Sequence, residues 1–284
     1  MFAQARPRAR RALRHTTLSA LSAGAAQSDR VRMSLSTPRV HFAYLHAVPV
    51  HEEPTFRRLL AYLSEGHDLV GHSEAVRRLR SGVVDRPTIS FSFDDAFASN
   101  HRTGAILEEF GTRGMFFVPG FFPGTNTLED ARHLFGYSQN ITEPAMSWDQ
   151  VADLVDRGHE IGNHTSTHRD LAKVPHDEVI RQIEHSASVL QERVGRCPHF
   201  AWPFGRRTHI TPEGIDATFA AGHETCASAE RGSHSASDLP AEAPLVLLRD
   251  HLMTSWPLEH NLYFLAQSAE RPVAPWSHYP QEWT

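Results

Sequence analysis

The residues best suited to chemistry in this chain are two histidines four positions apart. His164 and His168 lie in the segment EIGNHTSTHRDL, just after a short apolar run. On a helix, residues at i and i+4 share one face, so both imidazoles can point at one metal ion. A bound divalent ion usually takes at least one more protein ligand. The spacing therefore predicts part of a divalent-metal site that needs a third ligand.

A pair of carboxylates is the candidate for that third ligand. Asp94 and Asp95 follow the strand-like run 88–93, TISFSF. Two imidazoles and one carboxylate are typical of catalytic zinc and also suit Co, Ni, Mn or Fe, so we expect a divalent metal ion, zinc before the others. In an adjacent pair, one carboxylate coordinates while the other remains free. The alternative interpretation is that both aspartates only cap the following helix.

Apolar strand-like runs alternate with amphipathic helical stretches from Arg39 onward. This alternation predicts an α/β fold with a parallel sheet, either a barrel or doubly wound. In both folds the chemistry lies at the C-terminal ends of the strands, which is where the aspartate pair and both histidines fall. His46 also falls there and is a candidate for the acid of the site. The pattern predicts strands at 40–45, 88–93, 114–118, 159–162, 200–202, 224–227 and 245–248, and helices at 54–63, 104–110, 148–155 and 177–194.

Composition and charge limit the possible functions. The chain has 284 residues, 40% of them apolar and 21% charged, which is ordinary for a globular protein with one large domain. Residues 33–284 carry 21 basic and 32 acidic side chains, a net charge of −11, and this argues against nucleic acid as a partner. No apolar run is long enough to span a bilayer. Cys197 and Cys226 are expected to be buried thiols.

The two ends of the chain are expected to lie outside the folded domain. Residues 1–38 are arginine-rich and are predicted to be disordered or a leader, with the domain at 39–270 and a tail at 271–284. We favour a disordered segment, or a true start at Met33, and a cytoplasmic location. The alternative is secretion or export to the periplasm with residues 1–26 as a signal, since a weak apolar run follows the arginines.

Three motifs together resemble the NodB-type polysaccharide deacetylases of carbohydrate esterase family 4. SFDDAF, EIGNHTSTHRDL and FAWPFG occur in that order, and the resemblance covers about residues 40–251. It implies a distorted (β/α) barrel with fewer than eight parallel strands and with outer helices. It also implies metal-dependent removal of an acetyl group from a sugar. In that interpretation Asp95, His164 and His168 hold the metal, and Asp94 is the general base.

The third motif departs from the commonest pattern of that family. Many members have Arg-x-Pro-Tyr-Gly, in which the arginine orients the base, whereas this chain has Ala201 in the arginine position. The backbone N–H of Phe204 is expected to face the oxyanion, and Trp202 or Phe204 to line the acyl pocket. The alternative for both aromatics is core packing. Arg206 and Arg207 are the nearby candidates for orienting Asp94.

The last motif departs further and leaves the general acid open. Many members supply the acid from a Leu-x-His, but this chain has Arg249 in the place of that histidine and His251 two residues later. A branch that resembles exopolysaccharide deacetylases takes its acid from an N-terminal Tyr-His segment, and Tyr44 and His46 are similar to it. We therefore predict His46 as the acid and keep His251 as the alternative. A purely structural, buried His46 is the other interpretation.

The predicted function is that of a metal-dependent hydrolase. Metal-activated water, with an aspartate as base, would remove an acetyl group from an N-acetylated sugar or polysaccharide. Two alternatives remain: a hydrolase of another non-peptide amide, such as allantoin or a formamide, and a non-catalytic carbohydrate-binding domain. The loop at 121–146 is expected to lie over the active face, either as a lid or specificity element or as a surface excursion without such a role.

Overall fold

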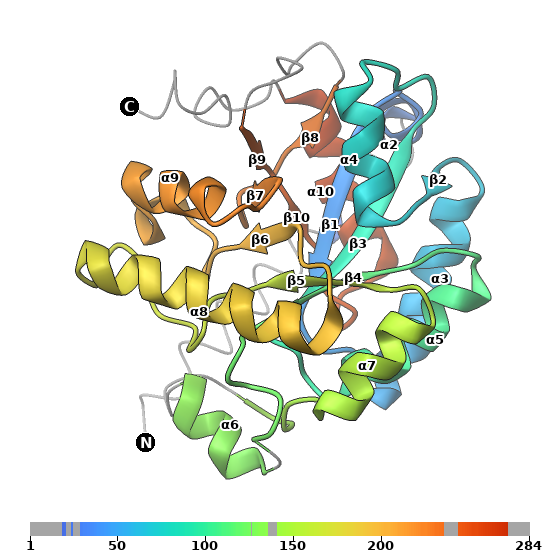
Figure 1. Ribbon diagram of the computed structural model, residues 1–284. Helices are drawn as coiled ribbons and strands as arrows, with labels where there is room; N and C mark the ends of the chain where they lie inside the picture. The colour runs from blue at the N-terminus through green and yellow to red at the C-terminus, as the bar shows by residue number, and fades with distance from the viewer. Residues whose placement is uncertain are drawn as a thin grey trace, which may run out of the picture.

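A curled, mostly parallel β-sheet with helices around its outside forms the body of the protein in the computed structural model (Figure 1). The structure describes residues 19–20, 24, 29–125, 127–135, 141–235 and 244–271. The predicted (β/α) barrel with parallel strands and outer helices is confirmed. The strands are β1 (Val40–Leu45), β2 (Asp68–Leu69), β3 (Thr88–Asp94), β4 (Met115–Val118), β5 (Glu160–Asn163), β6 (His199–Ala201), β7 (Thr225–Ala227), β8 (Ser233–His234), β9 (Leu245–Leu247) and β10 (Asp250–His251).

One chain segment joins the two ends of the sheet. The strand order is β10-β1-β3-β4-β5-β6-β7-β9, and every neighbouring pair in it is parallel. β9 pairs with β7 and ends at Leu247, and β10 begins at Asp250 and pairs with β1. Leu248 and Arg249 therefore lie where one strand changes partner. Outside this order, β2 pairs with β3, and β8 pairs with β1 in the antiparallel sense.

The helices bury apolar residues in the core of the protein. In α3, for example, Phe56, Leu59, Leu60 and Leu63 are buried, which is the i, i+3, i+4, i+7 pattern of a single face. The helices are α2 (Arg30–Leu35), α3 (Glu53–Ser64), α4 (His72–Arg80), α5 (Ser99–Glu109), α6 (Leu128–Phe135), α7 (Trp148–Asp156), α8 (His176–Val194), α9 (Pro212–Ala220) and α10 (Leu258–Glu270), with short 3-10 turns at Val50–Glu52 and Arg207–His209.

One helix closes the amino end of the barrel. Val76 and Leu79 of α4 pack in one buried cluster with Val40 and Met115, the first residues of β1 and β4. Two further clusters, one of them much larger, lie between the sheet and the outer helices. Apolar side chains of α4, β1 and β4 thus fill part of the amino end of the barrel.

The predicted strands and the predicted long helix agree with the structure to within about two residues. The helix predicted at 104–110 begins earlier, at Ser99, because polar residues of its first turn are buried and weaken the apolar pattern. Most of the predicted leader, residues 1–38, and the tail from 272 onward lie outside the described residues, so those boundaries stay predictions. No helix in the described ranges is both long and apolar enough to cross a bilayer.

Candidate active site

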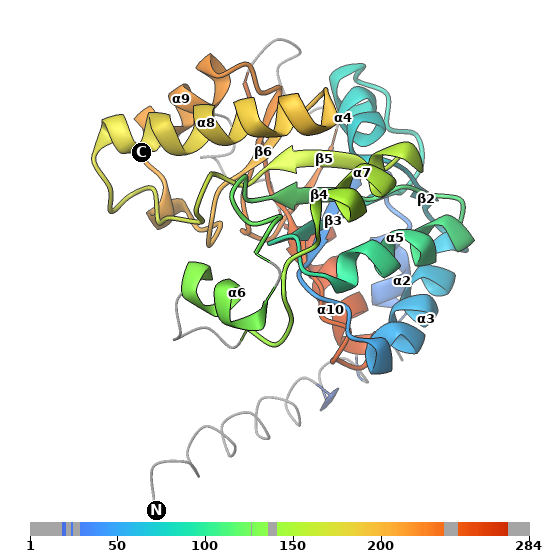
Figure 2. The same ribbon diagram turned by 60° about the horizontal axis from the view of Figure 1, so that its bottom comes forward.

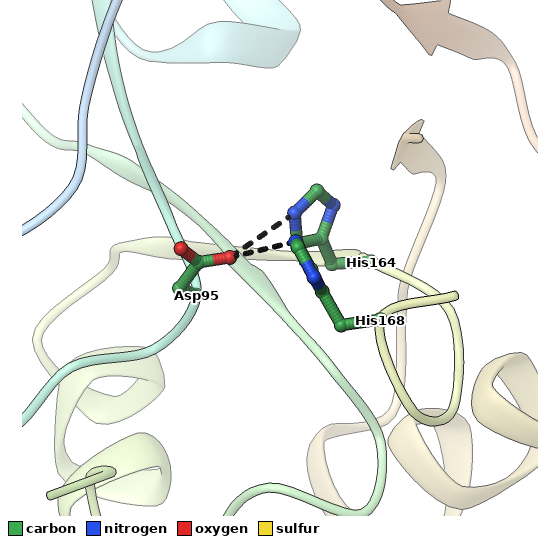
Figure 3. A group of neighbouring side chains, drawn as sticks. All are labelled: Asp95, His164 and His168. Carbon is green, nitrogen blue, oxygen red and sulfur yellow. Dashed lines mark ion pairs between the residues drawn. The ribbon is translucent and has the colours of Figure 1, made fainter. Parts of the chain in front are cut away.

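The three predicted metal ligands meet at the carboxyl end of the sheet. Asp95 follows β3, and His164 and His168 follow β5 (Figure 3). Their ligand atoms all lie within 4.8 Å of one another. Oδ1 of Asp95 is 3.4 Å from Nε2 of His164 and 3.2 Å from Nε2 of His168. Two strand ends that are distant in the sequence thus present one carboxylate and two imidazoles to a common point.

The segment that carries the histidines is a loop and not the helix that the i, i+4 spacing suggested. β5 ends at Asn163, and the backbone is left-handed at Thr165 (φ 66°) and His168 (φ 54°). Two local hydrogen bonds fix the turn: the Thr165 amide donates to Oδ1 of Asn163 at 2.9 Å, and the His168 amide donates to Oγ1 of Thr165 at 3.1 Å. The prediction of a shared helical face was therefore wrong, because these side chains offer the backbone a tight turn instead.

Left-handed backbone conformations are concentrated at this site. Six non-glycine residues in the described part of the chain have positive φ, and all but Asp29 belong to the three motifs: Asp95, Ala96, Thr165, His168 and Phe204. Each such conformation costs on the order of 1–3 kcal/mol and persists only where the surrounding structure imposes it. Strain of this kind is typical of functional sites, where it aims side chains.

The donor atoms at the site fit a divalent cation. Nδ1 of His164 lies 2.7 Å from the Ala201 carbonyl oxygen, which can only accept. That nitrogen therefore carries the hydrogen, and Nε2 turns its lone pair toward Asp95. Oδ1 of Asp95 is buried and accepts no hydrogen bond within the described residues. In metal sites the second ring nitrogen of a ligand imidazole commonly donates to such an acceptor, as Nδ1 of His164 does to the Ala201 carbonyl.

The charges at the site also favour a cation. Burial raises the pKa of Asp95, but the positive charge that His168 and His164 can carry outweighs it, so the net pKa lies well below its ordinary value. For His164, burial lowers the pKa, but Asp95 and Asp94 outweigh it and the net pKa is raised. A buried site with two ionised carboxylates attracts positive charge, which either a proton or a metal ion can provide.

An arginine that the sequence analysis had not assigned to Asp94 holds that carboxylate. Nη1 and Nη2 of Arg249 donate to Oδ1 and Oδ2 of Asp94, both at 2.8 Å, and Nε donates to the Ser228 carbonyl at 2.6 Å. Arg249 is fully buried in the link between β9 and β10. Arg249, and not Arg206 or Arg207, therefore supplies the bidentate contact to the predicted base. The sequence did carry a signal for this contact. The third motif has Ala201 in place of its usual arginine, and the last motif has Arg249 in place of its usual histidine.

The charge of Arg249 keeps Asp94 ionised. Burial raises the pKa of the Asp94 carboxyl, but the adjacent guanidinium and His164 outweigh it, so the net pKa is lowered. A planar guanidinium that binds both carboxylate oxygens also fixes the plane of the carboxylate. Asp94 is thus both charged and oriented.

The two candidate acids lie next to each other but differ in exposure. Nε2 of His46 is 3.9 Å from Oδ2 of Asp95, and the His46 side chain is 43% exposed. The His251 ring stacks on Tyr44, with centroids 4.7 Å apart, and stands edge-on to His46 at 5.4 Å. Burial, followed by the charges of His46 and Arg231, lowers the pKa of His251 to about 3. Of the two histidines, His46 is the one that faces both the ligand set and solvent.

The two aromatics of the third motif have different surroundings. Trp202 is fully buried in an apolar cluster, and its indole N–H donates to the Arg206 carbonyl at 3.0 Å. This favours the core-packing interpretation for Trp202. Phe204 is 43% exposed, and its ring centroid lies 4.9 Å from that of His168. Gly205 (φ 63°) permits the turn, since a Cβ there would lie 2.2 Å from the Cβ of Ala229.

The long connection at 121–146 contributes a further aromatic side chain that the sequence analysis had not singled out. Within it, α6 stands apart from the other helices (Figure 2). The ring of Phe135, the last residue of α6, lies 4.8 Å from that of His168. His168, a candidate metal ligand, therefore contacts both Phe135 and Phe204.

Comparisons of the sequence with known proteins point to polysaccharide deacetylases. Residues 81–223 match a family model described as polysaccharide deacetylase. A curated relative, a peptidoglycan-N-acetylglucosamine deacetylase of Bacillus cereus, is 42% identical over 53 residues, which is 19% of this chain and 19% of that protein. The chain therefore matches about a fifth of the length of that relative.

Two solved structures have a similar fold. The fold resembles a Streptococcus pyogenes deacetylase, PplD, in complex with acetate: TM-score 0.63 and 18% identity, over 83% of this chain and all of that one. It also resembles IcaB from Ammonifex degensii: TM-score 0.66 and 18% identity, over 83% of this chain and 99% of that one. At these identities the likeness concerns the fold.

Proposed function

The chain belongs to the polysaccharide deacetylase family, and on that premise we propose that it is a metal-dependent hydrolase that removes an acetyl group from an N-acetylated sugar or polysaccharide. The observation that carries the proposal is the Asp95–His164–His168 group next to a carboxylate, Asp94, that Arg249 holds in place. An enzyme of this kind needs a cation, a base, an acid and an oxyanion site, and the chain offers a residue for each.

Asp95, His164 and His168 are the residues that would hold the metal. A bound divalent ion would supply a Lewis acid for the acyl oxygen and for water, and zinc fits this donor set first, with Co, Ni, Mn or Fe as alternatives. The protein contributes the fixed His164 tautomer and a buried Asp95 oxygen that faces both imidazoles.

Asp94 is the proposed general base. Its lowered pKa keeps it ionised at neutral pH, and each oxygen keeps a free lone pair beside the hydrogen bond from Arg249. A carboxylate in a fixed plane can take a proton from water next to the ligand group without reorienting. In this proposal Arg249 positions the base, although it comes from a different strand than in the commonest members of the family.

His46 is the proposed general acid. The leaving amine must gain a proton when the C–N bond breaks, and an accessible imidazole beside the ligand set can donate one. The His46 backbone is fixed by Nδ2 of Asn100, which donates to its carbonyl oxygen at 2.8 Å. The backbone N–H of Phe204 is proposed to stabilise the oxyanion, and the exposed Phe204 ring to line the acyl pocket.

The binding-module alternative rested on the two altered motifs. Arg249 binds both oxygens of Asp94, and Nε2 of His46 lies 3.9 Å from Oδ2 of Asp95. These contacts offer substitutes for the two missing residues, which favours an enzyme over a binding domain. An allantoin-like amide or a formamide would use the same groups, so substrate tests must separate it from an acetylated sugar.

The test of the proposed function is acetate release. The purified protein is incubated with N-acetylglucosamine and its oligomers, with allantoin and with a formamide, before and after metal is added. We expect acetate from the sugars only with metal, and we expect no formate from the formamide and no ring opening of allantoin. Asp94→Asn should abolish turnover and retain metal, while Asp156→Asn on the exposed face of α7 serves as the matched control. Unchanged acetate release by Asp94→Asn would refute the assigned mechanism.

A further inference from the structure

Three aromatic rings form a compact group beside the candidate active site. The rings of Tyr44 and His251 are stacked, with centroids 4.7 Å apart and planes 17° apart. His46 stands edge-on to both, at 5.7 Å from Tyr44 and 5.4 Å from His251. The imidazole of His46 therefore has a wall of two parallel rings on one side and Asp95 on the other.

Sheet pairing and a buried cation fix the wall in place. Tyr44 and His251 are partners in the parallel β1–β10 register, so their side chains point to the same face. The guanidinium of Arg249 lies 4.6 Å from the centroid of the Tyr44 ring, within the range of a cation–π contact. Arg249 also binds Asp94, the proposed base, and His251 contacts His46, the proposed acid. The Tyr44 ring contacts both Arg249 and His251.

Hydrogen bonds from neighbouring groups hold the backbone at His251 and Leu252. Nη2 of Arg231 donates to the His251 carbonyl at 2.7 Å, and the Leu252 amide donates to the Tyr44 carbonyl at 2.9 Å. The adjacent Asp250 is fully buried and accepts from Oγ of Ser268 on α10 at 2.5 Å. With its backbone and neighbours anchored in this way, His251 has little freedom to move toward a substrate.

These contacts leave His251 unsuited to donate a proton itself. The side chain is largely buried, and burial is the main cause of a pKa near 3, so its imidazole is neutral at neutral pH. A neutral, stacked ring offers shape and contact rather than an acidic proton. The role that remains open to it is to shape the surroundings of His46.

We infer that His251 is a positioning residue: its ring, stacked on Tyr44, restricts the His46 imidazole so that Nε2 stays directed at the ligand carboxylate. This inference rests on the proposed function, in which His46 is the acid. It assigns different roles to the two histidines that the sequence left as alternatives. His46 donates the proton, and His251 fixes the orientation of His46.

Two substitutions of His251 and two substrates test the inference. His251→Phe keeps a flat ring and removes every proton-transfer group, whereas His251→Ala removes the ring. N-acetylglucosamine oligomers have an amine leaving group that needs a proton. 4-Nitrophenyl acetate has a leaving group that departs without one and so reports on the base and the metal alone.

We expect His251→Ala to lower kcat on the amide by about 10²-fold, as for loss of a general acid, with unchanged metal content and unchanged turnover of the ester. His251→Phe should recover most of the amide activity. His67→Ala is the matched control, because His67 is also buried and edge-on to another histidine, His41, but lies next to β2 at the amino end of the barrel. It should change stability only.

Several outcomes would overturn the inference. If His251→Phe is as inactive on the amide as His251→Ala while His46→Ala is active, His251 is itself the acid. If His251→Ala lowers amide and ester turnover equally, its role is general packing. If the alanine variant does not fold, His251→Gln replaces it, and amide activity equal to that of His251→Phe would contradict a role for the ring. Absence of acetate release by the unmodified protein would instead refute the proposed function.

Discussion

The two ends of the barrel bury polar groups in opposite ways. At the amino end, Glu160 accepts from the Ser73 hydroxyl and from the Ser73 amide at 3.0 Å. Oγ of Ser73 then accepts from Nε2 of His199 at 2.9 Å, and Nδ1 of His199 accepts from the Thr225 hydroxyl at 2.9 Å. In this series of hydrogen bonds every donor has an acceptor, and the imidazole of His199 is neutral.

The carboxyl end buries charges instead. Asp94, Asp95 and Arg249 are all buried, and the backbone around them is left-handed at several residues. A neutral, satisfied network stabilises the fold, whereas buried charges on a strained backbone are costly and are retained for chemistry. The comparison teaches that one barrel end stabilises the protein and the other end is available for function.

The largest effect is expected from breaking the buried ion pair at the carboxyl end. Arg249→Met leaves the Asp94 charge without its partner, so acetate release should be lost and the free energy of unfolding should fall by about 3–5 kcal/mol. Denaturant unfolding and acetate assays measure the two quantities. The double variant Arg249→Met with Asp94→Leu should regain stability but not activity. A double variant as unstable as the single one would contradict this account of the pair.

Metal binding should depend on the carboxyl end alone. His164→Ala and His168→Ala should lose bound metal, as measured by elemental analysis, and should lose acetate release. In the unmodified protein, free metal at a hundred times its Kd should add about 2.7 kcal/mol to stability. His199→Ala, at the amino end, should retain metal and the full metal-dependent gain in Tm. Loss of metal from His199→Ala would show that the two ends are coupled.

Acid should destabilise the protein in part through buried histidines at the amino end of the barrel. Burial, and then the charges of Arg196 and His223, lowers the pKa of His199 to about 3, and burial lowers that of His223 to about 4 against the opposing hydrogen bond to Cys197. Above about pH 6.5 the histidines are neutral in both the folded and unfolded states. As the pH falls below that value, only the unfolded chain gains protons, so stability is lost until the pH reaches the folded-state values.

The expected loss is about 1.4 kcal/mol per pH unit for each such histidine. Denaturant unfolding of the unmodified protein between pH 7 and pH 5 measures it, and His223→Gln should show a shallower decrease. A pH dependence that is identical in the variant would assign the acid sensitivity to other groups.

The smallest effect is expected from the neutral network at the amino end. Ser73→Ala removes one link between Glu160 and His199 and should cost about 1–3 kcal/mol of stability. Because the change lies at the opposite end from the ligand group, kcat should be unchanged. A reduced kcat with normal Tm would contradict the division between the two ends.

The strands and the residues of the candidate site could be predicted because their signals are local. The apolar run at 88–93 ends in two aspartates, and the structure places that pair at the end of β3. The same holds for β1 and His46, and for β5 and His164. The β-branched and aromatic residues of a strand and the polar residues that follow it are adjacent in the chain, so these elements and the residues after them were visible in the sequence alone.

Only the tertiary structure decided how those residues act together. Arg249 reaches Asp94 because one strand changes partner between Leu247 and Asp250, and a change of partner leaves no periodic signal in the sequence. The histidine loop depended on local turns that compete with the helix suggested by its spacing. The sequence by itself determined the parallel barrel, through local periodicity, and the candidate metal ligands, through residue types and the resemblance of their motifs to a family. The orientation of the base and the different surroundings of His46 and His251 depend on strand register and burial, which arise from contacts between distant segments.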